Sequence, residues 1–248
     1  MIYLWVAVMV VGLIGMIVCS KKQKTNPAMQ PVALGIFLVV IVSAVMLLLE
    51  TGIFGGGNTA IIESEYAFMA SRGHAAGAHL AKVAPGKKLV VVVEDANYEK
   101  SPHTKNLIDL LAKAYGAEAA VEALDLPAVS DDNPQPIEER MKAKHFDATL
   151  AKHKDAGVVV SLIGIPQDAR RMKAFSGKGP VFFLLGTGMG TGKFVADQMK
   201  KGTIAGVVVP NPKADYEAKA PKDPAKAFAI RFVLVTKENL DAHKQFFE

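Results

Sequence analysis

Two apolar stretches near the N-terminus constrain this chain more than any other feature. Residues 2–19 and 31–49 contain no charged side chain, and each approaches the roughly 20 apolar residues that a helix needs to cross a ~30 Å hydrocarbon core. We therefore predict a transmembrane helical hairpin over residues 1–50, with spans at about residues 2–19 and 31–49. The lipid bilayer is the first expected partner. Because neither span carries an ionisable group, we interpret both as anchors and not as an ion pathway.

The charges beside the spans set the expected orientation. Lys21, Lys22 and Lys24 lie in the short linker between the spans, whereas Glu50 is the first charge after the second span. Positive loops stay in the cytoplasm, so we expect a two-pass protein of the bacterial inner (cytoplasmic) membrane. Its N-terminus and C-terminal domain then lie on the periplasmic or outer side. A cleaved signal peptide is the alternative, but the stretch lacks a positive n-region and an A-x-A-like exit.

The rest of the chain has an ordinary, nearly neutral composition. The first 50 residues hold three Lys and one Glu, which leaves 26 basic and 23 acidic residues in the other 198. A nucleic-acid partner would require a concentrated basic face, so we expect none. Cys19 is the only cysteine, which excludes a disulfide within the chain and a Cys/His enzyme.

A glycine-rich segment at residues 51–59 separates the spans from the C-terminal domain and predicts a flexible hinge. After it, apolar and small residues recur at alternating spacings of four and three, which predicts one stripe along a helix. This helix either binds a partner as a coiled coil or packs on the domain's own sheet, and its small residues favour the sheet. The stripe consists of Ile62, Tyr66, Met69, Gly73, Ala76, Leu80 and Val83.

From residue 88 onward, short β-branched runs alternate with helical stretches. Continuous apolar strands of this kind are typical of a parallel sheet that helices cover on both faces. We therefore predict the α/β class, with one doubly wound, mostly parallel sheet of five to six strands in an extracytoplasmic domain over residues 60–248. The expected strands are residues 89–93, 119–124, 157–163, 181–185, 204–209 and 227–235, and the expected helices are residues 104–115, 137–152, 167–175, 193–200 and 237–246.

Candidate ligand-binding residues come directly after the strands, because ligands of such sheets bind beyond the carboxyl ends of the strands. The glycine turn at residues 186–192 precedes a helix, a pattern that aims backbone N–H groups at an anion. Its spacing matches neither a P-loop nor a dinucleotide fingerprint, so a mobile loop is the alternative. The candidates are Glu94, Asp95 and Asn97 after the first strand, Gly186, Gly188, Gly190 and Thr191 after the fourth, and Asn211 after the fifth.

No pattern of residues indicates catalysis. The chain has no G-x-S-x-G elbow, its histidines have no chelating spacing, and Glu94 and Asp95 have no third-strand Asp to complete a receiver-like magnesium site. We therefore expect no enzyme, no metal and no cofactor. Residues 212–226 contain three Pro and are either an arm that docks on a neighbouring subunit or an exposed loop.

Several phrases resemble a known family. Residues 81–88 (AKVAPGKK) lead into LVVVV and EDANY, GPVFFLLGT lies at residues 179–187, and KGTIAGVVV lies at residues 201–209. In this order, residues 80–210 resemble one lobe of a type I periplasmic solute-binding protein, an architecture like that of flavodoxin. The resemblance implies a solute held between two lobes. This chain has room for only one lobe, which departs from the family pattern, so a site of that kind would require two copies or a partner to supply the second wall.

These observations support two functions. The first is a non-enzymatic, membrane-anchored extracytoplasmic interaction module, an accessory subunit of a larger complex with membrane-protein partners. The alternative is a periplasmic small-solute-binding or sensing component of a transport system. In that alternative, Glu94, Asp95, the turn at residues 186–192 and Asn211 surround one small-molecule ligand.

Overall fold

The computed structural model describes residues 2–23, 29–50, 56–127, 135–177, 179–185 and 191–248. The chain divides into two compact units, residues 1–64 and residues 65–248. Each unit has its own internal packing.

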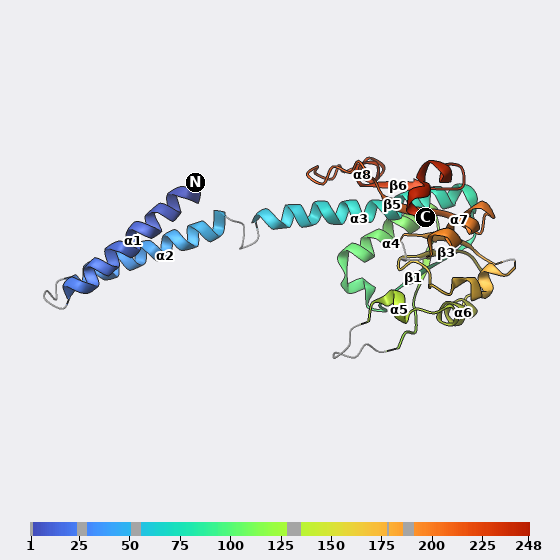
Figure 1. Ribbon diagram of the computed structural model, residues 1–248, viewed down its shortest axis with the longest axis horizontal. Helices are drawn as coiled ribbons and strands as arrows, with labels where there is room; N and C mark the ends of the chain where they lie inside the picture. Colours follow the sequence, from blue (N-terminus) through green and yellow to red (C-terminus); the bar gives the residue numbers. More distant parts are fainter. Residues whose placement is uncertain (1, 24–28, 51–55, 128–134, 178, 186–190) are drawn as a thin grey trace. The chain divides into compact units, whose positions relative to one another are not determined.

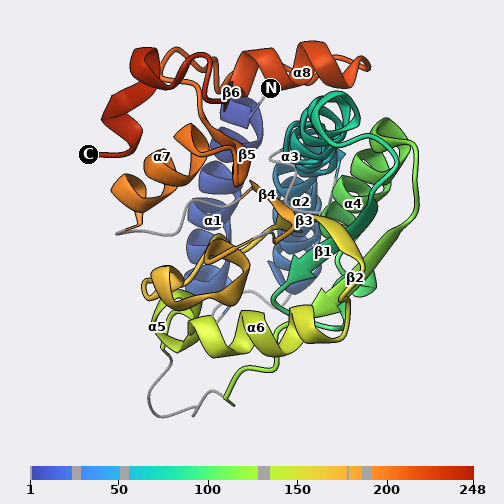
Figure 2. The same ribbon diagram turned by 90° about the vertical axis from the view of Figure 1, so that its right-hand side faces the viewer.

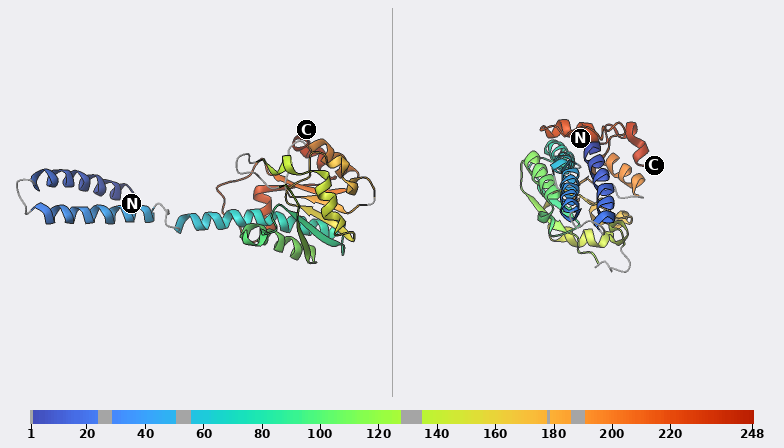
Figure 3. Two further views of the ribbon diagram at one scale, coloured as in Figure 1. Left: turned by 90° about the horizontal axis from the view of Figure 1, so that it is seen from below. Right: turned by 90° about the vertical axis from the view of Figure 1, so that its left-hand side faces the viewer.

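The first unit contains an antiparallel pair of apolar helices, α1 (Ile2–Gln23) and α2 (Met29–Glu50), which lie side by side (Figures 1 and 3). Gly12 of α1 lies against the side chain of Val40 of α2, so a small residue permits close approach there. The indole Nε1 of Trp5 donates to Oε1 of Glu50 at 3.1 Å. Both helices are long and apolar enough to cross a membrane, and many of their large apolar side chains are exposed.

Helix α3 (Gly56–Val83) begins inside the predicted hinge, so the prediction is wrong for the end of that segment. Residues 51–55 of that hinge lie outside the described residues, but residues 56–59 belong to the helix. Glycine costs about 1 kcal/mol at each helical position. A 28-residue helix offsets this cost because extending an existing helix is far easier than starting one.

The second half of α3 packs on the sheet. Gly73, Ala76 and Leu80 are buried, and Ala76 and Leu80 share a core cluster with strand residues, which confirms the prediction that the stripe packs on the domain's own sheet. Towards the other end of the stripe, Ile62 and Tyr66 are exposed. The stripe therefore continues beyond the part of α3 that the core covers.

The second unit is built on a six-stranded sheet in the order β2-β1-β3-β4-β5-β6 (Figure 2). The first five strands are parallel, and β6 pairs antiparallel with β5, which confirms the predicted fold class. The order reverses between β1 and β3, which makes that point the topological switch. The strands are β1 (Lys88–Val93), β2 (Ala119–Ala123), β3 (Ala156–Ser161), β4 (Val181–Leu184), β5 (Ile204–Pro210) and β6 (Phe232–Val235).

Helices cover both faces of the sheet, as a doubly wound fold requires. Helices α3 and α4 (Pro102–Tyr115) bury one face, where Leu107 and Leu111 meet Val91 of β1. Helices α6 (Ala143–Ala151) and α7 (Gly192–Lys200) bury the other, where Phe146 and Met199 belong to the second cluster. The two faces therefore have separate cores.

Several predicted helices are shorter or tighter than the sequence indicated. The stretch at residues 137–152 forms two helices, α5 (Ile137–Arg140) and α6, because Met141 and Lys142 adopt extended backbone. The stretch at residues 167–175 forms two 3₁₀ turns, Ala169–Arg171 and Lys173–Phe175. The last predicted helix is also 3₁₀, at Leu240–Phe246.

The predicted strand at residues 227–235 is wrong over its first half. That part belongs to α8 (Pro224–Arg231), and only Phe232–Val235 pair as a strand. Asp223 caps the helix, since its Oδ1 accepts a hydrogen bond from the N–H of Ala225 at 2.9 Å, and Pro224 is favourable at the first helical position. This start signal outweighs the apolar run that suggested a strand.

Candidate functional site

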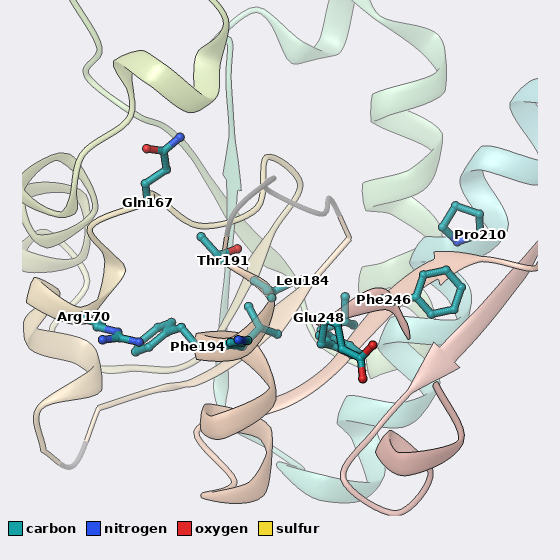
Figure 4. Close-up of a pocket in the computed structure, with 13 residues that line it drawn as sticks. Gln167, Arg170, Leu184, Thr191, Phe194, Pro210, Phe246 and Glu248 are labelled. Atoms are coloured by element: carbon teal, nitrogen blue, oxygen red, sulfur yellow. The ribbon is translucent and has the colours of Figure 1, made fainter. Parts of the chain in front are cut away.

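One candidate site is a cavity of about 690 Å³ beside α7, which we call the α7 cavity (Figure 4). Its volume is within the range of about 300–1,000 Å³ that is typical of small-molecule sites. It is lined by Gln167, Arg170, Leu184, Thr191, Gly192, Lys193, Phe194, Val195, Val207, Pro210, Phe246, Phe247 and Glu248.

Several segments build the α7 cavity. Leu184 ends β4 and Pro210 ends β5, so the cavity lies at the carboxyl ends of these strands, where ligands of parallel sheets bind. The other lining residues come mainly from the first turn of α7, the loop after β3 and the C-terminal segment. Gly192 permits the C-terminal segment to close one wall, because a side chain there would collide with the main chain of Phe247.

The α7 cavity combines an apolar wall with a few polar groups. Leu184, Val207 and Phe247 are buried apolar residues, whereas Arg170 and Glu248 are exposed and come from different segments around the opening (Figure 4). Small-molecule sites are typically built this way, since apolar contact supplies affinity and polar groups fix orientation.

A second, smaller cavity of about 290 Å³ lies at the carboxyl end of β1, and we call it the switch-point cavity. It occupies the α3 and α4 side of the sheet. It is lined by Arg72, Val93, Glu94, Asp95, Asn97, Tyr98, Ser101, His103, Thr104, Leu107, Leu162, Ile163 and Leu185.

The charged groups of the switch-point cavity already have partners. Oδ1 of Asp95 accepts hydrogen bonds from the backbone N–H and the side-chain amide of Asn97, at 2.8 and 3.1 Å, and these bonds lower the pKa of Asp95. Glu94 forms an ion pair with Arg140 at 3.7 Å. The guanidinium of Arg72 donates to the carbonyl of Leu185 at 3.1 Å, and burial lowers the pKa of Arg72.

The hydroxyl groups of this cavity also bond to one another. Thr104 donates to Oγ of Ser101 at 3.2 Å, and that Oγ lies 2.8 Å from Nδ1 of His103. Among the described residues, no group of three or more His, Cys, Asp or Glu side chains is placed to hold a metal ion. Most polar side chains of the switch-point cavity therefore already bond to groups of the protein itself, which leaves few of them to bind a ligand.

The structure separates the candidate residues that the sequence suggested. Glu94, Asp95 and Asn97 lie together in the switch-point cavity, whereas Thr191 lines the α7 cavity on the other face of the sheet. Gly186, Gly188 and Gly190 lie outside the described residues. The structure does not bring Glu94 and Thr191 around one ligand. Helix α4 follows β1 and helix α7 follows β4, and these two helices cover opposite faces of the sheet.

Asn211 lines neither cavity. Its Nδ2 donates to the carbonyl of Ala229 at 3.2 Å, and its Oδ1 accepts from the N–H of Lys213 at 2.9 Å. Both ends of the amide therefore hold the turn after β5.

Sequence reasoning missed most residues of the α7 cavity. Gln167 and Arg170 belong to a segment predicted as a regular helix, and Phe246 to Glu248 come from the C-terminal segment, which joins the site only through tertiary packing. Lys193 directly follows the predicted glycine turn at residues 186–192. Its position beside this turn was a sequence signal that could have identified it as a lining residue.

No protein-family model matches this chain, and a search of curated proteins finds no relative. Among solved structures, it is similar to GanP, a glucose-galactose binding protein from Geobacillus stearothermophilus, with 19% identity over 69% of this chain and 61% of that chain, at a TM-score of 0.45. A carbohydrate transporter from Acidothermus cellulolyticus, in complex with myo-inositol, is similar at 12% identity, over 73% and 61% of the two chains, with a TM-score of 0.45.

AraP, an arabinose binding protein from Geobacillus stearothermophilus, is similar at 15% identity over 70% of this chain and 62% of that chain, with a TM-score of 0.43. This chain spans about three fifths of the length of these three proteins.

Proposed function

We propose that this chain is a membrane-anchored protein whose single α/β lobe binds a small solute in the α7 cavity. The observation that carries this proposal is the cavity itself, about 690 Å³ at the carboxyl ends of β4 and β5. We prefer this function to that of an interaction module. No enzymatic step is included in it.

The walls of the α7 cavity support binding without large rearrangement. Leu184 and Val207 are fixed by the core, and Phe194 packs edge to face on Phe175 with ring centroids 5.3 Å apart. A wall that is already ordered loses little conformational entropy on binding. Gln167 and Thr191 then provide polar groups at the opening and the floor of the site.

A thermal-shift screen of the whole chain in detergent tests this function. We expect one class among sugars, polyols, amino acids and organic acids to raise the melting temperature of the lobe by about 5–10 °C at a hundredfold excess over Kd. Gln167→Trp should remove the shift, because a bulky ring at an exposed lining position fills the opening. Arg171→Trp, at an exposed neighbour outside the lining, is the matched control. A shift that survives in Gln167→Trp would place the solute elsewhere.

We also propose the two-pass topology with the lobe on the periplasmic side. It is supported by the length and apolar character of α1 and α2 and by Lys21 and Lys22 beside the linker. In a Cys19→Ser background, Lys222→Cys should react with an impermeant maleimide in spheroplasts, whereas Lys21→Cys should react only after lysis. The reverse pattern would contradict this topology.

An accessory subunit of a membrane complex is the second candidate function. It is favoured by Tyr216, whose side chain is 68% exposed on the segment between β5 and α8, since exposed tyrosines are frequent in interface hot spots. Extraction in mild detergent that yields only a monomer would count against it.

A further inference from the structure

We infer that the solute of the α7 cavity is a small anion, one that carries a carboxylate or a phosphate group. The inference rests on the proposed function and names the class of its ligand.

Two cations line the α7 cavity from separate segments. Arg170 comes from the loop after β3, and Lys193 comes from the first turn of α7. Neither side chain forms an ion pair or a hydrogen bond with another described residue. A planar guanidinium matches the oxygens of a carboxylate or a phosphate, and an ammonium adds a compact charge.

Two largely buried arginines elsewhere on this lobe are already paired. Arg140 of the switch-point region faces Glu94, and Arg231 is bonded to Glu65 at 2.9 Å. Arg170 and Lys193 differ from these cations because neither has an acidic partner in the described part of the chain, so both are available to an anion in the α7 cavity. The positive end of the α7 helix dipole has the same sign.

One acidic side chain, Glu248, also lines the α7 cavity. It has no ion-pair partner among the described residues, so it opposes the two cations and leaves a net charge of one positive unit from the side chains. A carboxylate at this position repels any anion in the cavity, and a repulsive group is one route to selectivity. The three charges therefore predict mutational effects of opposite sign.

Calorimetric titration of the whole chain in detergent tests the inference with matched probes. We expect glucose 6-phosphate, succinate or inorganic phosphate to bind at least tenfold more tightly than glucose. For the anion that binds, Arg170→Gln and Lys193→Gln should each weaken binding about three- to tenfold, since both side chains are exposed. Glu248→Gln should tighten binding about twofold, and added salt should weaken it. A comparison of succinate with phosphate identifies the charged group.

Arg171→Gln and Lys200→Gln are the matched controls, because both positions are exposed and lie outside the lining. They should leave the affinity unchanged. If glucose binds and none of the three anions does, or if the charge variants have no effect, the anion inference is wrong and the binding function stands. If neither neutral nor anionic probes bind, the inference and the binding function fail together.

Discussion

Alanine at Gly73 or Gly77 is expected to lower the free energy of unfolding of the lobe by about 3 kcal/mol at each site. The two glycines face the main chain of α4: a methyl group at Gly73 would fall on the carbonyl oxygen of Leu107, and one at Gly77 on that of Leu111. Backbone atoms cannot rotate away as side chains do. Helix α3 would therefore have to move away from α4 and leave gaps in the core that contains Leu80.

This loss is expected even though alanine favours a helix over glycine by about 1 kcal/mol. Thermal unfolding of the whole chain in detergent should show a fall of about 6–12 °C for each variant. Gly177→Ala is the control, because nothing lies within 4 Å of the added methyl group. Gly73→Ala and Gly77→Ala with unchanged melting temperatures would mean that α3 and α4 are not packed as described.

Methionine at Arg231 should cost about 2–3 kcal/mol and release the segment between β5 and α8. The guanidinium is only 5% exposed and lies between the rings of Phe68 and Tyr216, 4.3 and 4.5 Å from their centroids. It also donates to Oε1 of Glu65 at 2.9 Å and to the carbonyl of Tyr216 at 3.0 Å. One side chain thus ties the 211–223 segment to α3.

Two further variants separate the contributions of charge and stacking. Arg231→Lys should cost almost as much as Arg231→Met, because an ammonium cannot stack between two rings. Glu65→Gln should cost less than about 1 kcal/mol, because the Glu65 carboxylate is half exposed. The readout is the rate of limited trypsin cleavage at Lys213, Lys219 and Lys222. Unchanged stability and cleavage in Arg231→Met would contradict the role of Arg231 as a clamp.

Arg231 also contacts the segment at residues 212–226. The sequence left open whether this segment docks on a neighbouring subunit or is an exposed loop. In the structure, Tyr216 is held to Arg231, and the N–H of Asn211 donates to the carbonyl of Arg231 at 2.8 Å. The segment therefore has a fixed place on its own domain, although the outer face of Tyr216 remains available.

The sheet could be predicted from the sequence because its strands are apolar on both faces. Runs such as Leu89–Val93 and Val158–Val160 fit the centre of a parallel sheet, and both are buried. Gly116 was also readable as the end of a helix, and its φ of 84° is the left-handed conformation that glycine adopts at that position. Local signals decided these elements.

Other elements depended on competition between local signals. Residues 227–231 are apolar enough for a strand, but Asp223 and Pro224 start a helix just before them. Residues 167–175 have helical spacing, yet the carboxylate of Asp168 accepts a hydrogen bond from the N–H of Ala143 at 2.8 Å. A distant contact of this kind favours tight turns over a regular helix, and no local pattern could have revealed it.

The candidate site was predictable in location but not in composition. Parallel topology alone pointed to the carboxyl edge of the sheet, and Thr191, one of the predicted candidates, lines the α7 cavity there. The sequence could not show that α4 and α7, the helices after β1 and β4, cover opposite faces of the sheet. Nor could it show that Phe247 closes one wall of the α7 cavity. Both facts come from long-range packing.

Native mass spectrometry of the whole chain, extracted from its membrane in mild detergent, tests the central claim most directly. We predict one small molecule retained per chain, with a mass that corresponds to a single solute, and its loss in Gln167→Trp but not in Arg171→Trp. A chain that carries no solute, or one that keeps it equally in both variants, would contradict binding in the α7 cavity.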